Sequence, residues 1–137
     1  MMLVSCDKDE DNIITFNSTP EKELQGIFTG IYVRVQNGTT DTLRAEGTMT
    51  LTATDTLYMT KITFDSNEMT ELAGIVAIPA NISHADRGYM FYNKSGDNTL
   101  TGRVSDDHTV QLRFSKLIRI SARKSIRYNY LFTGRKQ

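Results

Sequence analysis

A chain of 137 residues is within the usual length of one domain, and its 39% hydrophobic residues suffice for a core. The formal net charge of +0 argues against nucleic acid as a partner. No stretch reaches the roughly 18 to 20 apolar residues of a membrane-spanning helix. A single cysteine excludes an internal disulfide framework, so we expect one domain that is held together by packing.

The single cysteine lies in a short N-terminal motif. Leu3-Val4-Ser5-Cys6 resembles the lipobox of bacterial lipoproteins, in which the cysteine is lipidated and becomes the first residue of the mature protein. The resemblance implies a lipid anchor on Cys6, with residues 1–25 comprising a truncated signal peptide remnant, an acidic tether and a short helix. Residues 7–11 are acidic except for Lys8, which suits a solvated linker because such a run has no apolar surface to bury.

The acidic run after Cys6 bears on localisation. In some Gram-negative lipoproteins such a run resembles a signal for export to the cell surface, whereas in enteric-type lipoproteins an Asp directly after the cysteine, like Asp7, resembles an inner-membrane retention signal. The density of acids in residues 7–11 favours the first interpretation. We therefore expect an outer-membrane lipoprotein of the cell envelope that is exposed at the cell surface.

A short helix and a series of strands are expected after the tether. Residues 19–26 suit one or two helical turns, with Thr19 at the N-cap and Pro20 at the first helical position. From Ile27 onward, β-branched and aromatic residues alternate with polar ones, which favours strands. The longest link between the strands is expected at 79–87. The predicted strands are 27–36, 43–53, 56–64, 71–78, 88–93, 99–105, 109–120 and 126–133.

The short links imply that consecutive strands pair in antiparallel fashion. Eight strands that pair in order can close into a barrel, which removes exposed sheet edges. The sequence therefore predicts an all-β fold, a single eight-stranded up-and-down barrel over residues 26–137. A β-sandwich is the alternative, but the sequence has neither the cysteine pair nor the tryptophan of immunoglobulin domains, which favours the barrel.

Both ends of the predicted barrel carry a family likeness. Residues 26–32 contain Gly30-Ile31-Tyr32 in the first strand, a Gly-x-aromatic motif similar to the opening of calycin (lipocalin-like) barrels, and residues 130–135 complete the likeness. The chain resembles the small calycin-like lipoproteins of unassigned function from Gram-negative bacteria. Lipocalins proper carry Gly-x-Trp at this motif, so the resemblance implies a barrel without specifying a ligand.

Candidates for catalysis are few in this sequence. Metal binding or acid–base chemistry needs converging His, Cys or carboxylate groups, and the histidines are only His84, expected in the long link, and His108, expected in a hairpin turn. The common hydrolase, phosphate-binding and metalloprotease motifs do not occur in the sequence. We expect no enzyme, no cofactor and no metal.

The C-terminal part of the chain is basic, since no acid follows His108. Alternation in strands 109–120 and 126–133 predicts bases on the outer face of one hairpin. This basic face is either a solvated barrel exterior or a docking surface for an anionic glycan, a lipid headgroup or an acidic protein. Its expected members are Arg113, Arg119, Arg123 and Arg127. The apolar face is expected to fill the barrel, through Val110, Leu112, Phe114, Ile118, Tyr128 and Tyr130.

Two further groups of candidate residues follow from the sequence. Tyr89, Phe91 and Tyr92 come after the longest link, which could act as a lid over a barrel mouth, so these aromatics are candidates for a ligand site. Asp-Thr-Leu occurs twice and resembles the acceptor of a bacterial periplasmic O-glycosylation system, which makes Thr42 and Thr56 candidate modification sites.

The function expected from these features is a non-enzymatic binding module for a small ligand or an anionic partner. A structural or assembly component of an outer-membrane complex is the alternative. A lysozyme inhibitor is a further alternative by analogy of fold. Those inhibitors carry a Ser-Gly-x-x-Tyr loop, whereas here Ser95-Gly96-Asp97-Asn98 is followed by Thr99.

Overall fold

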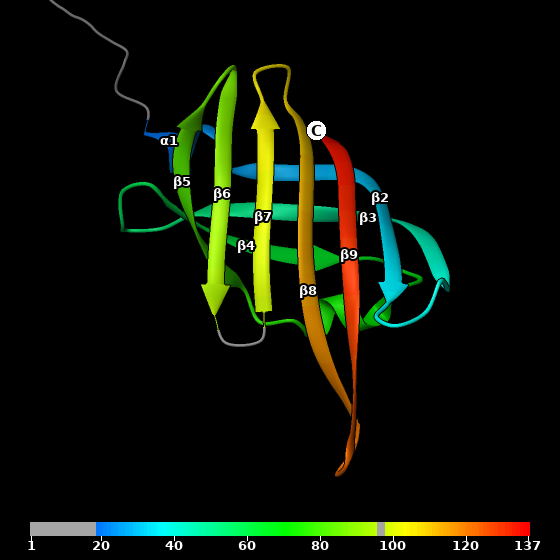
Figure 1. Ribbon diagram of the computed structural model, residues 1–137. Helices are drawn as coiled ribbons and strands as arrows, with labels where there is room; N and C mark the ends of the chain where they lie inside the picture. The colour runs from blue at the N-terminus through cyan, green and yellow to red at the C-terminus, as the bar shows by residue number, and fades with distance from the viewer. Residues whose placement is uncertain (1–18, 96–97) are drawn as a thin grey trace, which may run out of the picture.

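The computed structural model describes residues 19–95 and 98–137. Eight antiparallel strands close into one barrel in chain order, with the last strand pairing with the first (Figure 1). In Figure 1, β5 to β9 stand upright in front, and β2 to β4 cross behind them. The predicted up-and-down barrel is confirmed. Its strands are β2 (Gly26–Gln36), β3 (Thr42–Ala53), β4 (Met59–Asp65), β5 (Ile78–Ala85), β6 (Gly88–Ser95), β7 (Asn98–Ser105), β8 (Thr109–Ser121) and β9 (Lys124–Lys136).

Aromatic rings fill the barrel. The ring of Tyr32 lies 4.6 Å from that of Phe132 and 6.4 Å from that of Phe64, measured between centroids. Phe64 stacks on Phe114 at 4.2 Å, and Phe114 stacks on Tyr130 at 4.7 Å. All five side chains are buried, because alternation turns them to the same side of their strands. We call this continuous group the aromatic column. The barrel is therefore a packed core rather than an open calyx.

Short helical elements cover the two ends of the barrel. At one end, α1 (Pro20–Glu23) buries the neighbouring Leu24, and the backbone N–H of Tyr58 donates to a carboxylate oxygen of Glu21 at 2.9 Å. Thr19 occupies the N-cap position as predicted, but its side chain makes no capping hydrogen bond. At the other end, the 3-10 helix η1 (Thr70–Gly74) buries Leu72 beside the buried Met69.

One predicted strand and one predicted link were wrong. The strand expected at 71–78 is mostly η1 followed by residues 75–77, which belong to no strand, and the link expected at 79–87 is mostly strand β5. Pro79 suggested a loop, yet it is the second residue of β5, where a missing N–H is tolerated. Because β5 is a strand, the loop proposed as a lid does not exist.

The strands do not pair equally along the barrel. β4 and β5 share only the four paired positions from Met59–Asn81 to Ile62–Ile78. β8 and β9 instead pair along nearly their whole length. The start of β4 also differs from the prediction, because residues 56–58 form a turn in which Tyr58 has φ of 60°.

The β8–β9 hairpin projects beyond the rest of the barrel (Figure 1). The pairing of β7 with β8 stops at Leu100–Phe114, whereas β8 and β9 pair on to Ser121–Lys124. Ile118 was predicted to fill the barrel and does not. It pairs with Ile126 in the projecting part of the hairpin and is half-buried. Tyr128 is also half-buried, while the remaining interior residues predicted from β8 and β9 are buried.

Candidate functional site

A cleft opens at the end of the barrel that η1 covers in part. It lies between the segment 75–79 on one side and the end of β6, the start of β7 and the middle of β8 on the other, with a volume of about 200 Å³. We call it the mouth cleft. Its walls combine aliphatic and aromatic side chains with a few polar groups at the edge. They are Ile75, Val76, Ala77, Ile78, Pro79, Asn93, Thr99, Leu100, Phe114, Ser115 and Lys116.

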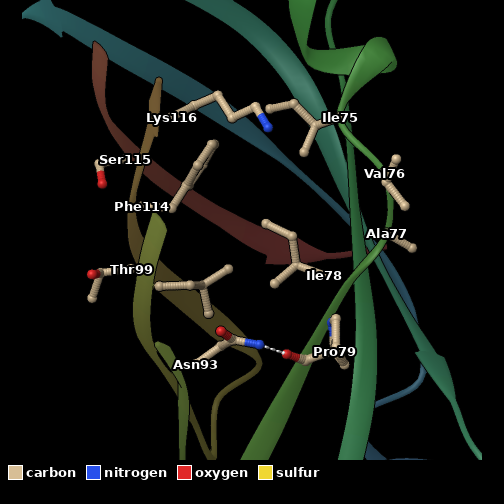
Figure 2. Close-up of a pocket in the computed structure, with 11 residues that line it drawn as sticks. Ile75, Val76, Ala77, Ile78, Pro79, Asn93, Thr99, Phe114, Ser115 and Lys116 are labelled. Carbon is tan, nitrogen blue, oxygen red and sulfur yellow. Dashed lines mark hydrogen bonds between the residues drawn. The ribbon is translucent and has the colours of Figure 1, made fainter. Parts of the chain in front are cut away.

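The walls of the mouth cleft are apolar inside and basic at the edge. Figure 2 shows Ile78 and Phe114 facing each other across it, with the side chain of Lys116 reaching from β8 toward Ile75. Asn93 donates from its Nδ2 to the carbonyl oxygen of Pro79, which ties β6 to β5 at the cleft (Figure 2). Phe114 is 4% exposed and stacks between Phe64 and Tyr130, so the floor of the cleft is a member of the aromatic column.

Lys116 is the cationic group of this site. It follows Phe114 by two residues on β8 and so turns to the same side of the strand. No carboxylate in the described part of the chain forms an ion pair with it. An ammonium at the edge of an apolar cleft, with no ion pair to an acid of residues 19–95 or 98–137, favours an anionic group on any ligand that enters.

A polar network fixes η1 against the barrel beside the cleft. The Arg34 guanidinium on β2 forms an ion pair with Oε2 of Glu71 at 2.6 Å, and the hydroxyl of Tyr130 donates to the same oxygen at 2.9 Å. Arg34 also lies over the Tyr128 ring, 4.5 Å from its centroid. Since Glu71 belongs to η1, these contacts position the segment 75–79 that follows it.

We expect acid to weaken this network. Burial raises the pKa of Glu71, but hydrogen bonds from its own backbone, Arg34 and Tyr130 outweigh burial, so its pKa lies below the ordinary value of 4.5. The contribution of Glu71 to stability is thus fully present above about pH 4.5 and is lost as the pH falls through its lowered pKa. Replacement Glu71→Gln should cost about 1 kcal/mol at pH 7. Thermal melts should show this cost shrinking below pH 4.5.

The matched control for that measurement is Glu68→Gln, an exposed carboxyl shortly before η1. Its melting curve should follow the unmodified protein at every pH. If the melting temperatures of Glu71→Gln and of the unmodified protein fall in parallel down to about pH 3, then acid does not act through the ion pair of Arg34 with Glu71.

The structure separates the three aromatics predicted as ligand contacts. Phe91 is buried in the core and Tyr92 is 50% exposed on the opposite side of β6. Tyr89 lies at the α1 end, where its hydroxyl donates to Glu23 at 3.1 Å and its ring lies 5.2 Å from that of His84. They do not converge on one site.

The predicted basic residues lie on the β8–β9 hairpin. Arg113 and Arg119 are exposed on β8, and Arg123 is exposed in the turn between the strands. Arg127 is half-buried and donates to Oγ of Ser115 at 3.2 Å. The four arginines therefore share one hairpin, although Arg127 has a structural contact and Arg113 lies on the barrel wall.

The other candidates occupy separate places. Thr42 and Thr56 are exposed, at the start of β3 and in the turn before β4, so both are accessible to a modifying enzyme. His84 lies on β5 rather than in a loop, and His108 lies in the β7–β8 turn with φ of 69°. Cys6 is outside the described residues. Within residues 19–95 and 98–137, no three His, Cys, Asp or Glu side chains gather as a metal site requires.

Comparisons with known proteins leave the family undetermined. No protein-family model matches the chain, and neither a curated protein nor a solved structure matches it. The resemblance to calycin-like lipoproteins therefore stays a hypothesis. None of the helices in the described part of the chain is long and apolar enough to span a membrane.

Proposed function

We propose that the protein is a non-enzymatic binding module of the bacterial cell envelope, tethered through a lipid on Cys6 to the outer membrane. Its ligand, in this proposal, is a small amphipathic anion, a short aliphatic chain that ends in a carboxylate, held in the mouth cleft. The observation that supports this assignment is the combination, in one cleft, of apolar walls and the ammonium of Lys116, which pairs with no carboxylate of the described residues.

The size of the cleft limits the ligand. A water molecule occupies about 30 Å³ of liquid, so a cleft of about 200 Å³ holds roughly seven groups of that size. A straight-chain acid of about five or six carbons matches this number when its carboxylate remains at Lys116. The aromatic column blocks deeper entry, because Phe114 and Tyr130 are buried and stacked.

The affinity for straight-chain acids should depend on chain length in a defined way. Burial of one methylene contributes about 0.8 kcal/mol, so each added carbon from butanoate to hexanoate should lower Kd about fourfold. Beyond about heptanoate the gain should cease, because further carbons remain in water. Isothermal titration calorimetry or ligand-observed NMR of the full chain measures this series.

Two variants separate the cleft from nonspecific binding. Lys116→Met keeps the length of the side chain and removes its charge, so hexanoate should bind about fivefold more weakly, a loss of about 1 kcal/mol. Lys22→Met removes an exposed charge on α1, at the opposite end of the barrel from the cleft, and should leave Kd unchanged. Equal binding of hexanoate and butanoate, or equal losses in both variants, would contradict the proposal and favour the assembly role.

A further inference from the structure

The projecting part of the β8–β9 hairpin has unpaired strand edges. Among the described residues, β7 pairs with β8 only as far as Phe114, so the β7 side of residues 115–121 is open. On the other strand, the register of β2 with β9 ends at Gln36–Tyr128, and one further hydrogen bond joins Asn37 to Arg127. Figure 1 shows this hairpin extending past every neighbouring strand. We call residues 115–121 the free edge.

An open edge of this kind presents backbone N–H and C=O groups in the order that another extended chain can match. The barrel itself is closed, and the edge arises where β8 continues beyond its pairing with β7. Peptides that add a strand to an exposed edge gain affinity from main-chain hydrogen bonds and specificity from side chains on either face. Glycans and lipid headgroups have no backbone amides to use such an edge.

The exposed side chains of the hairpin favour a negatively charged partner. Arg119, Arg123 and Lys124 are exposed, and no acid occurs between His108 and the C-terminus. Two copies of this hairpin would bring like charges together, which opposes pairing between copies. An acidic strand would instead find a base on either side of the edge.

The apolar side chains of the hairpin also favour a peptide over a membrane. Leu117 is 38% exposed, and Ile120, at the register shift after Arg119, is 54% exposed. Strand alternation puts Arg119 on the face of Leu117 and Lys116 on the other face, so each face carries a base. Neither face is a continuous apolar surface, whereas a strand added at the edge contacts both faces.

We propose that the free edge binds an extended acidic segment of a protein partner, which adds to β8 as a further antiparallel or parallel strand. The segment would alternate carboxylate and β-branched side chains. This inference goes beyond the mouth cleft: the free edge shares Ser115 and Lys116 with the cleft wall, but it depends on the backbone groups of β8 and on Arg119 and Arg123.

The test uses the full chain and a fluorescent octapeptide of alternating Glu and Val, with both ends blocked. Anisotropy should show saturable binding, and hydrogen exchange should show slower exchange of the amides in residues 115–121 when the peptide is bound. The same octapeptide N-methylated at alternate residues, which removes the donors on one edge, should bind at least tenfold more weakly. Phosphatidylglycerol vesicles should bind no more strongly than phosphatidylcholine vesicles.

Charge variants complete the experiment. Arg119→Glu combined with Arg123→Glu should weaken binding at least tenfold, while Arg44→Glu combined with Arg103→Glu, exposed on β3 and β7, should change it less than threefold. Melting curves establish that both variants fold. The proposal fails if the N-methylated peptide binds equally well, if both charge variants weaken binding equally, or if only the anionic vesicles bind.

Discussion

Replacement of Gly30 by alanine should destabilise the barrel by about 3 kcal/mol or more, at the upper end of the range for overpacked sites. A Cβ at Gly30 would lie 2.0 Å from the carbonyl oxygen of Thr133 and 2.5 Å from Cα of Gly134. Both atoms belong to the backbone of β9, so no side-chain rotation relieves the contact. β2 and β9 must separate at the pairing that closes the barrel.

Chemical denaturation of the Gly30→Ala protein measures this loss, and Gly74→Ala is its control. A Cβ at Gly74 meets nothing within 4 Å, so alanine there should leave stability unchanged or raise it by about 0.5 kcal/mol through the unfolded chain. A loss below about 1 kcal/mol for Gly30→Ala would mean that β2 and β9 approach less closely than the structure has them.

Truncation of Phe132 to alanine should cost about 3 to 5 kcal/mol, the range for a large aromatic residue in a core. Phe132 is 0% exposed and packs against Tyr32 at one end of the aromatic column. The cavity left behind would lie between β2 and β9, where backbone pairing limits collapse. Since domains of this size are stable by about 5 to 15 kcal/mol, the variant should lose a large part of its stability.

Thermal melting measures this loss, with an expected fall in Tm of roughly 10 °C or more. The control is Leu57→Ala, because Leu57 is apolar and 68% exposed in the turn before β4. Its stability should change by less than about 0.5 kcal/mol. Similar losses in the two variants would mean that the aromatic column is not the main source of core stability.

The barrel could be predicted because most strands carry their own alternating pattern. In β4, buried Thr60, Ile62 and Phe64 alternate with exposed residues, and each short link allows pairing only with the next strand. The pattern of β5 is weaker, because Ala80 is small and Pro79 and Asn81 are typical of loops. Its strand form depends on pairing with β4 and β6, which is a property of the tertiary structure.

The candidate site was harder to predict than the fold. The basic hairpin was visible in the sequence, because its charges are close together along the chain. The mouth cleft was not, since Ile75 and Lys116 are far apart in sequence and meet only when η1 closes part of the barrel. Residues 75–78 are apolar and were predicted as part of a strand over 71–78, whereas Val76 is 84% exposed outside any strand. The sequence also could not reveal that β8 continues beyond its pairing with β7, because the register between the two strands determines where that pairing stops.

The short pairing of β4 with β5 gives the barrel an uneven resistance to local opening. The ladder has four paired positions, with one more backbone hydrogen bond from Ile82 to the carbonyl oxygen of Tyr58, and Pro79 at one position has no amide hydrogen to donate. Local separation of β4 from β5 breaks few hydrogen bonds and leaves the aromatic column packed. The free energy of this local opening therefore lies well below the free energy of global unfolding. Ile78 and Pro79 line the mouth cleft, so local opening at this pair of strands would shift one wall of the cleft while Phe114 at its floor stays packed.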